Sequence, residues 1–272
     1  MKKAIGFNAG QYGDLIISTA AAKVFKERFP DSELTLGISK NFSEISPLFY
    51  NHLYFDNIHI WEGYNNWPSD IDKKYLEFKK YDIIFNAMPQ HTRNDWYNYH
   101  HFTQEICLSH GFEPTENLQC NLTKWFDTIP GYENYIALSV FPGYGASNGR
   151  TFSIEKLNEL VDNIHKLGYK TILIGTDKEP KLNNTETTNT TFFNSVKTML
   201  SCKMLITADT AMSWVASAYN FPTIGYYTRN YIDMKIDRIC SHIPVNSRGQ
   251  YIAADKITDI PIEKIIELIK NS

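Results

Sequence analysis

Short apolar runs alternate with amphipathic helical patterns along the whole chain, and this alternation constrains the fold more than any other feature. Runs of about four to eight apolar residues are typical of buried parallel strands, and longer periodic segments are typical of connecting helices. A chain of 272 residues has room for two such domains or for one large one. The pattern therefore predicts an α/β fold with parallel sheets.

The two halves of the chain each show this βα alternation, with a break near Ile129-Pro130-Gly131. In the first half we expect strands at 3–8, 33–39, 58–61 and 82–87, and helices at 15–28, 70–80 and 96–110. In the second half we expect strands at 135–140, 171–175, 191–194, 204–208 and 223–227, helices at 154–167, 196–201, 211–219 and 261–270, and a surface loop at 181–190. This organisation predicts two Rossmann-like domains, 1–130 and 131–272, facing a central cleft that binds the ligand.

Composition and charge exclude several other classes of protein. No apolar run approaches the ~18 residues of a membrane span, and the apolar stretch after Met1 is too short for a signal peptide. We therefore expect a soluble, cytoplasmic protein without an integral membrane segment. A net charge of −3 lacks the basic excess of a duplex-binding protein. The four scattered cysteines form no CxxC pair, so we expect neither a disulfide framework nor a zinc knuckle.

The first strand runs into a loop that carries Gly10 and Gly13 and ends at Asp14. Glycines at a strand-to-helix turn let the backbone approach a ligand closely, next to the amides of a helix N-terminus. The loop is not GxGxxG, so it carries no dinucleotide fingerprint. On residue type alone, Asp14 fits either a catalytic carboxylate or a helix cap.

Three loops of the second half repeat this arrangement at the ends of predicted strands. Gly143 follows the strand at 135–140, and Arg150 just beyond it suits a phosphate or a solvated loop position equally. Asp177 and Glu179 follow the strand at 171–175, where carboxylates hold ribose hydroxyls or simply begin a helix.

The segment Met204–Pro222 is the most informative of these loops. An apolar strand leads into Asp209-Thr210-Ala211-Met212-Ser213-Trp214 and then into a helix rich in small residues. Asp209 and Thr210 stand where a helix cap is expected, so the amides of the first turn would form an anion site. Capping alone would also explain both residue types.

Three stretches, in the same order as in the family, resemble the glycosyltransferase family 9 enzymes, the ADP-heptose:lipopolysaccharide heptosyltransferases and their relatives. They are GDLIISTAAAKVFKERFPDSELTL at 13–36, FPGYGASNGRTFSIEKLNELVDNIHKLGYKTILIG at 141–175 and TMLSCKMLITADTAMSWVASAYNFPTIGYY at 198–227. Positions 40–130 show no convincing match. The resemblance implies a GT-B fold, with an acceptor domain at 1–130 and a nucleotide-sugar donor domain at 131–272. It also allows the last helix, 261–270, to pack back on the first domain.

The family motifs assign roles position by position. The general base of the family falls on Asp14, and its phosphate-binding lysine falls on Arg150, with Phe152 at the family's tryptophan position. The Asp-Thr/Ser-Gly that meets the diphosphate falls on Asp209-Thr210-Ala211, and the amides from there to Ser213 complete the site. Trp214 stands where the family has histidine, and an indole donates only one hydrogen bond or stacks on a ring.

This resemblance implies an inverting transfer that needs no metal, with a nucleotide diphosphate sugar as co-substrate and no other cofactor. Asp14 would deprotonate the acceptor hydroxyl, and Arg150 with the helix amides would stabilise the leaving diphosphate. Asp70-Ile71-Asp72 spells the DxD of metal-dependent transferases, but it begins a predicted helix, where acidic residues are favoured anyway.

A segment rich in histidine and aromatic residues, 91–102, follows the strand at 82–87. Its side chains suit stacking and hydrogen bonding to a sugar or a base, which makes His91, Arg93, Asp95 and Trp96 candidates for acceptor binding. Trp96, Tyr99 and Phe102 also have helical spacing and fit a packed core equally well.

Several functions remain open on this sequence. The leading one is a glycosyltransferase acting on a surface glycan or a lipid-linked, lipopolysaccharide-type core. The alternatives are a phage-type enzyme that glycosylates a modified base in DNA, a sugar-nucleotide epimerase or hydrolase of the same fold, and a non-catalytic sugar-nucleotide-binding protein. The sequence leaves the donor, the acceptor and the oligomeric state open.

Overall fold

The computed structural model of the chain describes residues 1–8, 11–62, 80–86, 103, 118–143, 149–228 and 243–272. The described residues form two compact units, and the boundary between them in the sequence falls between Trp125 and Phe126. Each unit is built around its own parallel sheet, as the alternation in the sequence predicts.

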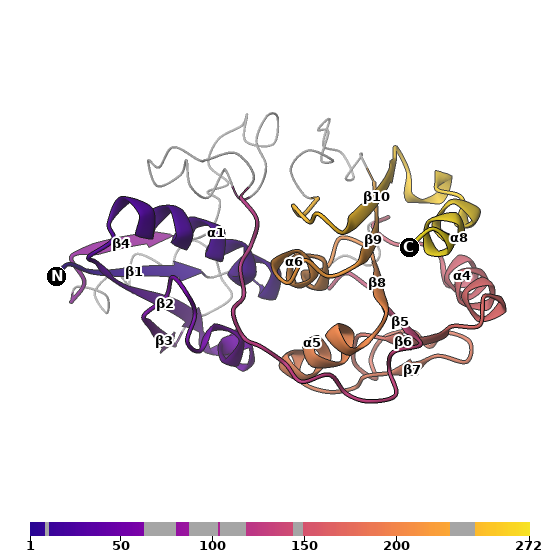
Figure 1. Cartoon of the computed structure of the whole chain (residues 1–272), viewed down its shortest axis with the longest axis horizontal. Coiled ribbons are helices and arrows are strands. Elements are labelled where there is room, and N and C mark those ends of the chain that lie inside the picture. The colour runs from indigo at the N-terminus through magenta and orange to yellow at the C-terminus, as the bar shows by residue number, and fades with distance from the viewer. Residues whose placement is uncertain (9–10, 63–79, 87–102, 104–117, 144–148, 229–242) are drawn as a thin grey trace. The chain divides into compact units, whose positions relative to one another are not determined.

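Among the described residues of the first unit, four strands form a parallel sheet in the order β3-β2-β1-β4 (Figure 1). Its strands are β1 (Lys3–Asn8), β2 (Glu33–Ser39), β3 (Asn57–Trp61) and β4 (Ile83–Asn86). The chain leaves β1 towards β2 on one side and returns to β4 on the other, so the order reverses at β1. In open α/β sheets, ligands bind beyond the carboxyl ends of the strands at this kind of reversal.

Helix α1 (Tyr12–Arg28) follows β1 and is buried along most of its length. Ala20, Ala21 and Ala22 are all fully buried, as expected for a helix with apolar residues on every side. The helix ends at Arg28, and its C-cap residue Phe29 comes directly before Pro30. It begins three residues earlier than the periodicity predicts, so Gly13 and Asp14 lie in its first turn rather than in the preceding loop.

In the part of the second unit that the structure describes, six strands form a parallel sheet in the order β10-β9-β8-β5-β6-β7. Its strands are β5 (Tyr135–Ser139), β6 (Lys170–Leu173), β7 (Glu186–Thr187), β8 (Met204–Thr207), β9 (Thr223–Thr228) and β10 (Gly249–Ala254). Here the order reverses between β5 and β8. Helices α5 (Phe192–Ser201) and α6 (Ala211–Ala218) lie on one face of this sheet, with α4 (Ile154–Lys166) and α8 (Ile262–Lys270) on the other (Figure 1).

The apolar face of α8 packs into the core of the second unit. Ile262, Ile265 and Ile269 are buried in the same cluster as Leu157 and Val161 of α4. The apolar face of α8 is therefore buried within the core of the second unit.

The strands come close to their predicted bounds, but the prediction of a strand at 191–194 is wrong. Thr191 is the N-cap of α5, and its side chain accepts a hydrogen bond from the Asn194 amide at 3.3 Å. The β-branched threonine and the two phenylalanines after it favour a strand locally, and the cap overrides them. The sequence analysis also missed β7, β10 and the 3₁₀ segment η1 (Lys40–Phe49).

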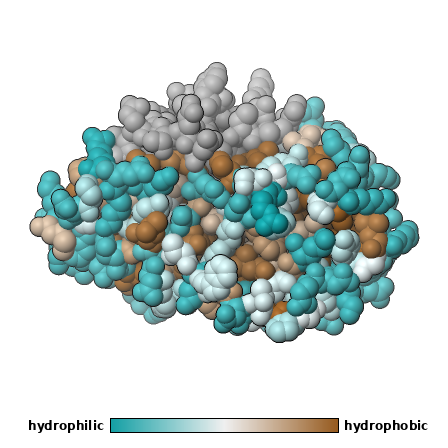
Figure 2. Space-filling view, in the orientation of Figure 1, coloured by the Kyte–Doolittle hydropathy of each residue, from teal (hydrophilic) through white to brown (hydrophobic). Residues whose placement is uncertain are grey.

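The face of the molecule in Figure 2 is mostly hydrophilic, with smaller apolar patches between the polar side chains. Among the described residues, the large hydrophobic side chains that are exposed all belong to the first unit: Met1, Tyr50, Leu53, Ile60 and Trp125. Within the described ranges, no helix has the length and apolar character needed to cross a membrane.

Candidate functional site

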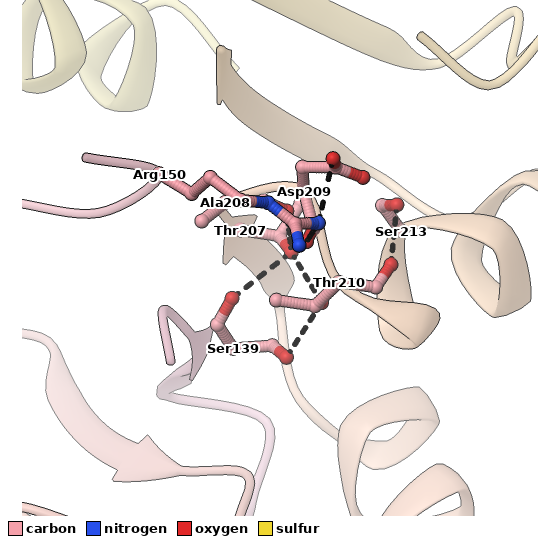
Figure 3. Close-up of polar contacts among 7 residues, drawn as sticks. All are labelled: Ser139, Arg150, Thr207, Ala208, Asp209, Thr210 and Ser213. Atoms are coloured by element: carbon pink, nitrogen blue, oxygen red, sulfur yellow. Dashed lines mark hydrogen bonds and ion pairs between the residues drawn. The ribbon is translucent and has the colours of Figure 1, made fainter. Parts of the chain in front are cut away.

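The candidate site lies where the strand order of the second sheet reverses, at the carboxyl ends of β5 and β8. These two strands pair in parallel and end side by side, with Ser139 opposite Thr207. The chain then continues from Thr207 through Ala208, Asp209 and Thr210 into α6 (Figure 3). Two strand ends and a helix N-terminus therefore meet at one point of the fold.

Three hydroxyl groups connect these elements. The Thr210 Oγ1 lies 2.9 Å from the Ser139 Oγ and 3.0 Å from the Thr207 Oγ1. The Thr207 hydroxyl also lies 3.0 Å from the Ser139 carbonyl oxygen and 2.7 Å from the Ala208 carbonyl oxygen. The sequence analysis missed Ser139 and Thr207, although each is a hydroxyl residue that closes an otherwise apolar strand.

Arg150 and Asp209 form an ion pair next to this network (Figure 3). One guanidinium nitrogen, Nη2, donates to the Asp209 carboxylate at 2.7 Å and to the Asp209 carbonyl at 2.8 Å. Both side chains are more than four-fifths buried, at 17% and 18% exposure. The structure therefore brings together two residues that lie 59 positions apart and that the sequence assigned separately to one site.

The residues after Arg150 fix its segment on the sheet. The ring of Phe152 stacks on Tyr226 of β9 with ring centroids 4.4 Å apart, and the Thr151 hydroxyl lies 3.3 Å from the Tyr226 hydroxyl. Phe152 stands at the family's tryptophan position, and here it is a buried packing residue. This anchoring holds the backbone that carries the guanidinium.

Tyr227 lies buried in the neighbourhood of the ion pair, and the sequence analysis missed it. Burial raises the pKa of its hydroxyl well above the ordinary value, and the Asp209 carboxylate adds to this shift. The ring also packs edge-on against Tyr251 of β10, with centroids 6.0 Å apart. At the pH of the cell Tyr227 is therefore a neutral phenol that adds no charge to the site.

The first turn of α6 faces the site without a side-chain cap. Thr210 is the N-cap residue, but its side chain makes no capping hydrogen bond. The Ser213 hydroxyl donates to the Thr210 carbonyl at 2.7 Å, and the Ser213 amide lies 3.1 Å from the same oxygen. The amides of Ala211 and Met212 come before the first intrahelical bonds, so they suit an external acceptor. Trp214 is 4% exposed and packs inside the unit.

The two carboxylates beyond β6 differ in their surroundings. Glu179 is half-buried and folds back towards Gly175, where an added Cβ would lie only 2.8 Å from the Glu179 Cγ. Burial raises the pKa of the Glu179 carboxyl above its ordinary value. Asp177 is exposed. Glu179 is therefore the carboxylate held against the strand end, next to β5.

In the first unit, Asp14 lies in the first turn of α1, just beyond the end of β1. Its carboxylate accepts a hydrogen bond from the Gln11 amide at 2.8 Å, and the side chain is half-buried. Tyr12 in the same turn donates to Glu44 of η1 at 2.5 Å. The capping role that the sequence left open for Asp14 is present, because its carboxylate accepts from the amide of the N-cap residue.

The remaining predicted site residues give little further geometry. Gly143 is exposed beyond the end of β5. His91, Arg93, Asp95 and Trp96 lie outside the described residues, as do Asp70, Asp72 and the histidine-rich segment. Within the part of the chain that the structure describes, no three His, Cys, Asp or Glu side chains gather as metal ligands would.

Comparison with protein-family models and with curated proteins gave no match. Solved structures do resemble the chain. The E. coli ADP-heptose LPS heptosyltransferase II aligns with a TM-score of 0.71 at 14% identity, over 100% of this chain and 98% of that one. The glycosyl transferase family 9 structure from Veillonella parvula aligns at 0.70 and 14% identity, over 99% and 96%. The chain has the fold of the heptosyltransferases.

A third similar structure, the E. coli heptosyltransferase WaaC with ADP, aligns with a TM-score of 0.67 at 11% identity, over 99% of both chains. The alignments span both units, so the expected two-domain GT-B fold is confirmed for the whole chain. The structural resemblance to glycosyltransferase family 9, which the three sequence stretches predict, is confirmed in the same way.

Proposed function

We propose that this protein is a glycosyltransferase that moves a sugar from a nucleotide diphosphate sugar to an acceptor hydroxyl. The observation that carries the proposal is the site at the ends of β5 and β8, where a guanidinium and the uncapped first turn of α6 meet. Both features favour a bound anion. The position of these groups at the carboxyl ends of the strands, where the strand order reverses, supports the proposal, because doubly wound sheets bind their ligands there.

The proposed donor site uses residues of the second unit. The amides of Ala211 and Met212 and the guanidinium of Arg150 face the diphosphate, and Glu179 holds the ribose hydroxyls. The similarity to structures named as heptosyltransferases supports a sugar of the hexose or heptose class as the transferred group. The acceptor that fits best is a surface glycan or a lipopolysaccharide-type core, bound by the first unit.

The proposed reaction inverts the anomeric carbon. The Asp14 carboxylate takes the proton of the acceptor hydroxyl as the acceptor oxygen attacks that carbon. The bond from the anomeric carbon to the diphosphate oxygen breaks, and the nucleoside diphosphate leaves with the electron pair. Arg150 and the α6 amides stabilise the charge that develops on it. Since these groups supply positive charge without a metal, we propose that transfer does not require one.

A binding measurement tests the donor site. We expect ADP, UDP or GDP, or one of the corresponding nucleotide sugars, to raise the melting temperature in the presence of EDTA by several degrees at 100 times its Kd. Arg150→Ala should lower the affinity for this ligand at least tenfold, because it removes a charged hydrogen-bond donor. Arg248→Ala is the matched control, since Arg248 is exposed and lies at the opposite end of the sheet, next to the start of β10. Absence of binding to all of these nucleotides would refute the proposal.

A second measurement separates a transferase from a binding protein. Asp14→Asn should abolish sugar transfer while it leaves nucleotide affinity within about twofold, since the base acts on the acceptor and not on the donor. The asparagine still accepts the Gln11 amide hydrogen bond, so α1 keeps its start. Transfer that persists in Asp14→Asn would remove Asp14 from the mechanism.

A further inference from the structure

We propose that Ser139 and Thr207 are positioning residues that act through Thr210. On this proposal they fix the first turn of α6, so that its backbone amides receive the donor diphosphate and the Thr210 hydroxyl does not. The inference rests on the proposed function, because it specifies how the same anion site is built.

The direction of each hydrogen bond in the network follows from counting protons. The Thr207 hydroxyl has one proton and lies within 3.0 Å of two carbonyl oxygens, neither of which can donate. Its proton is therefore committed to these carbonyl oxygens, which can only accept, and none is left to donate to Thr210. Thr207 is then an acceptor towards Thr210, and Thr210 donates to it over 3.0 Å.

The remaining contact is fixed in turn. Since the single proton of Thr210 points to Thr207, the 2.9 Å contact with Ser139 requires Ser139 to donate to Thr210. The relay runs from Ser139 to Thr210, then to Thr207 and finally to a backbone carbonyl. All three protons point into the protein.

The direction of the hydrogen bonds decides which groups at the N-terminus of α6 can bind a diphosphate. Ionised phosphate oxygens only accept hydrogen bonds, so a hydroxyl whose proton is already committed does not bind them. Because the Thr210 side chain points into the relay, it also leaves the first turn uncapped. The groups that remain are the amides of Ala211 and Met212, which the helix geometry leaves available.

The relay joins the three elements that meet at the site. Ser139 ends β5, Thr207 ends β8 and Thr210 begins α6, and both strand residues are at least 95% buried. A buried network with each proton assigned holds its members in one arrangement. The first turn of α6 is therefore tied to the two central strands, and its amides keep a fixed direction.

A double-mutant cycle on ADP binding tests this arrangement. We expect Thr207→Val and Thr210→Val each to raise the Kd for ADP about tenfold, as measured by calorimetry. Because Thr207 acts through Thr210, the double variant should bind ADP no more weakly than the poorer single variant. Thr207→Ser and Thr210→Ser keep the hydroxyls and should restore binding. Losses that multiply in the double variant would show that Thr210 contacts the ligand itself and would overturn the inference.

A matched control separates positioning from general stability. Thr171 of β6 is also a buried strand threonine, and its hydroxyl contacts His165 at 3.0 Å and Thr185 at 2.7 Å. Thr171→Val should lower the melting temperature as Thr207→Val does, yet leave the Kd for ADP unchanged. Equal losses of affinity in both variants would overturn the proposal.

Two further results keep the inference separate from the proposed function. If Thr207→Val does not fold, Ser139→Ala can be used instead, because it removes the donor at the start of the relay. This variant should raise the Kd for ADP several-fold. Wild-type protein that binds ADP, together with unaltered binding in Thr207→Val or Ser139→Ala, would overturn the relay alone. Wild-type protein that binds none of ADP, UDP, GDP and pyrophosphate would overturn both proposals.

Discussion

Arg150 carries the positive charge of the proposed donor site, and it is already paired with the Asp209 carboxylate. A single guanidinium nitrogen serves two oxygens of that residue, so the pair is held by geometry as well as by charge. The carboxylate has two opposite effects on a diphosphate. It orients the guanidinium, and it repels the incoming anion.

Replacement of Asp209 by asparagine separates these effects. The asparagine side-chain oxygen still accepts from Arg150, while the negative charge is removed, so we expect ADP to bind about three- to tenfold more tightly. The affinity should also fall more steeply with salt, since the site gains a net positive charge. Calorimetric titration at two ionic strengths measures both. Asp162→Asn removes an exposed charge from α4 and is the control. Weaker binding in Asp209→Asn would mean that orientation outweighs repulsion.

His52 of the first unit gives a prediction about pH. Its Nδ1 accepts from the Tyr54 amide at 3.1 Å, so its Nε2 carries the proton and donates to the Asn121 carbonyl at 2.8 Å. Burial lowers the pKa of His52, and the hydrogen bond to Asn121 opposes this shift only in part. The folded state therefore favours the neutral ring. Its contribution to stability is complete above the ordinary histidine pKa of about 6.5 and is lost as the pH falls through the lower folded value.

Thermal unfolding between pH 7.5 and 5.5 tests this sign. As the pH is lowered, the melting temperature of the first unit should decrease in the wild type. It should decrease less in His52→Gln, which cannot take up the proton. His165→Gln in the second unit is the control. A first unit whose stability rises on acidification would contradict the assignment of a neutral ring.

At the scale of elements, two glycines make room for the tyrosines beside the site. A Cβ on Gly225 of β9 would lie 2.7 Å from both the Tyr227 Cε2 and the Tyr251 Cδ1. A Cβ on Gly249 would instead meet the Tyr251 hydroxyl, Cζ and Cε2, which lie at the far end of that side chain. We therefore expect Gly225→Ala to lower the free energy of unfolding by about 1–3 kcal/mol. Gly249→Ala should cost less. Denaturant titration compares the two, and equal losses would show that the rings are not confined at Gly225.

Most strands and helices of the described residues are predictable from the sequence because each one is a local pattern. The bounds of β1 and β2 agree residue for residue, since buried parallel strands read as short apolar runs. The exceptions also have local causes. At 191–194, aromatic and β-branched residues favour a strand locally, but in the structure the Thr191 cap starts a helix there. The edge strand β10 begins with glycine and has a single fully buried position, so it lacks an apolar run.

The candidate site is predictable only in part for the same reason. Local patterns place Asp209 and Thr210 at a helix start and Arg150 beyond a strand. The ion pair spans 59 positions and the contact between Ser139 and Thr210 spans 71, and no local pattern reports such contacts. They depend on the strand order, which brings β5 next to β8.

At the scale of the whole molecule, each of the two compact units has its own sheet and its own proposed task. The described groups of the proposed donor site all belong to the second unit, and Asp14 belongs to the first. Transfer on this proposal needs both units, whereas nucleotide binding needs one. Chains with two compact units often unfold in more than one step, so calorimetry can follow the units separately.

Ligand binding should therefore stabilise one unit selectively. Leu36→Ala in β2 and Leu160→Ala in α4 each empty a fully buried site and should lower one unfolding transition by about 2–5 kcal/mol, which assigns the transitions. ADP at 100 times its Kd should then raise the transition that Leu160→Ala lowers, by ~2.7 kcal/mol, and leave the other in place. In Arg150→Ala the shift should shrink. Equal shifts of both transitions would instead mean that the nucleotide is held by both units, because a ligand stabilises only the folded states that it contacts.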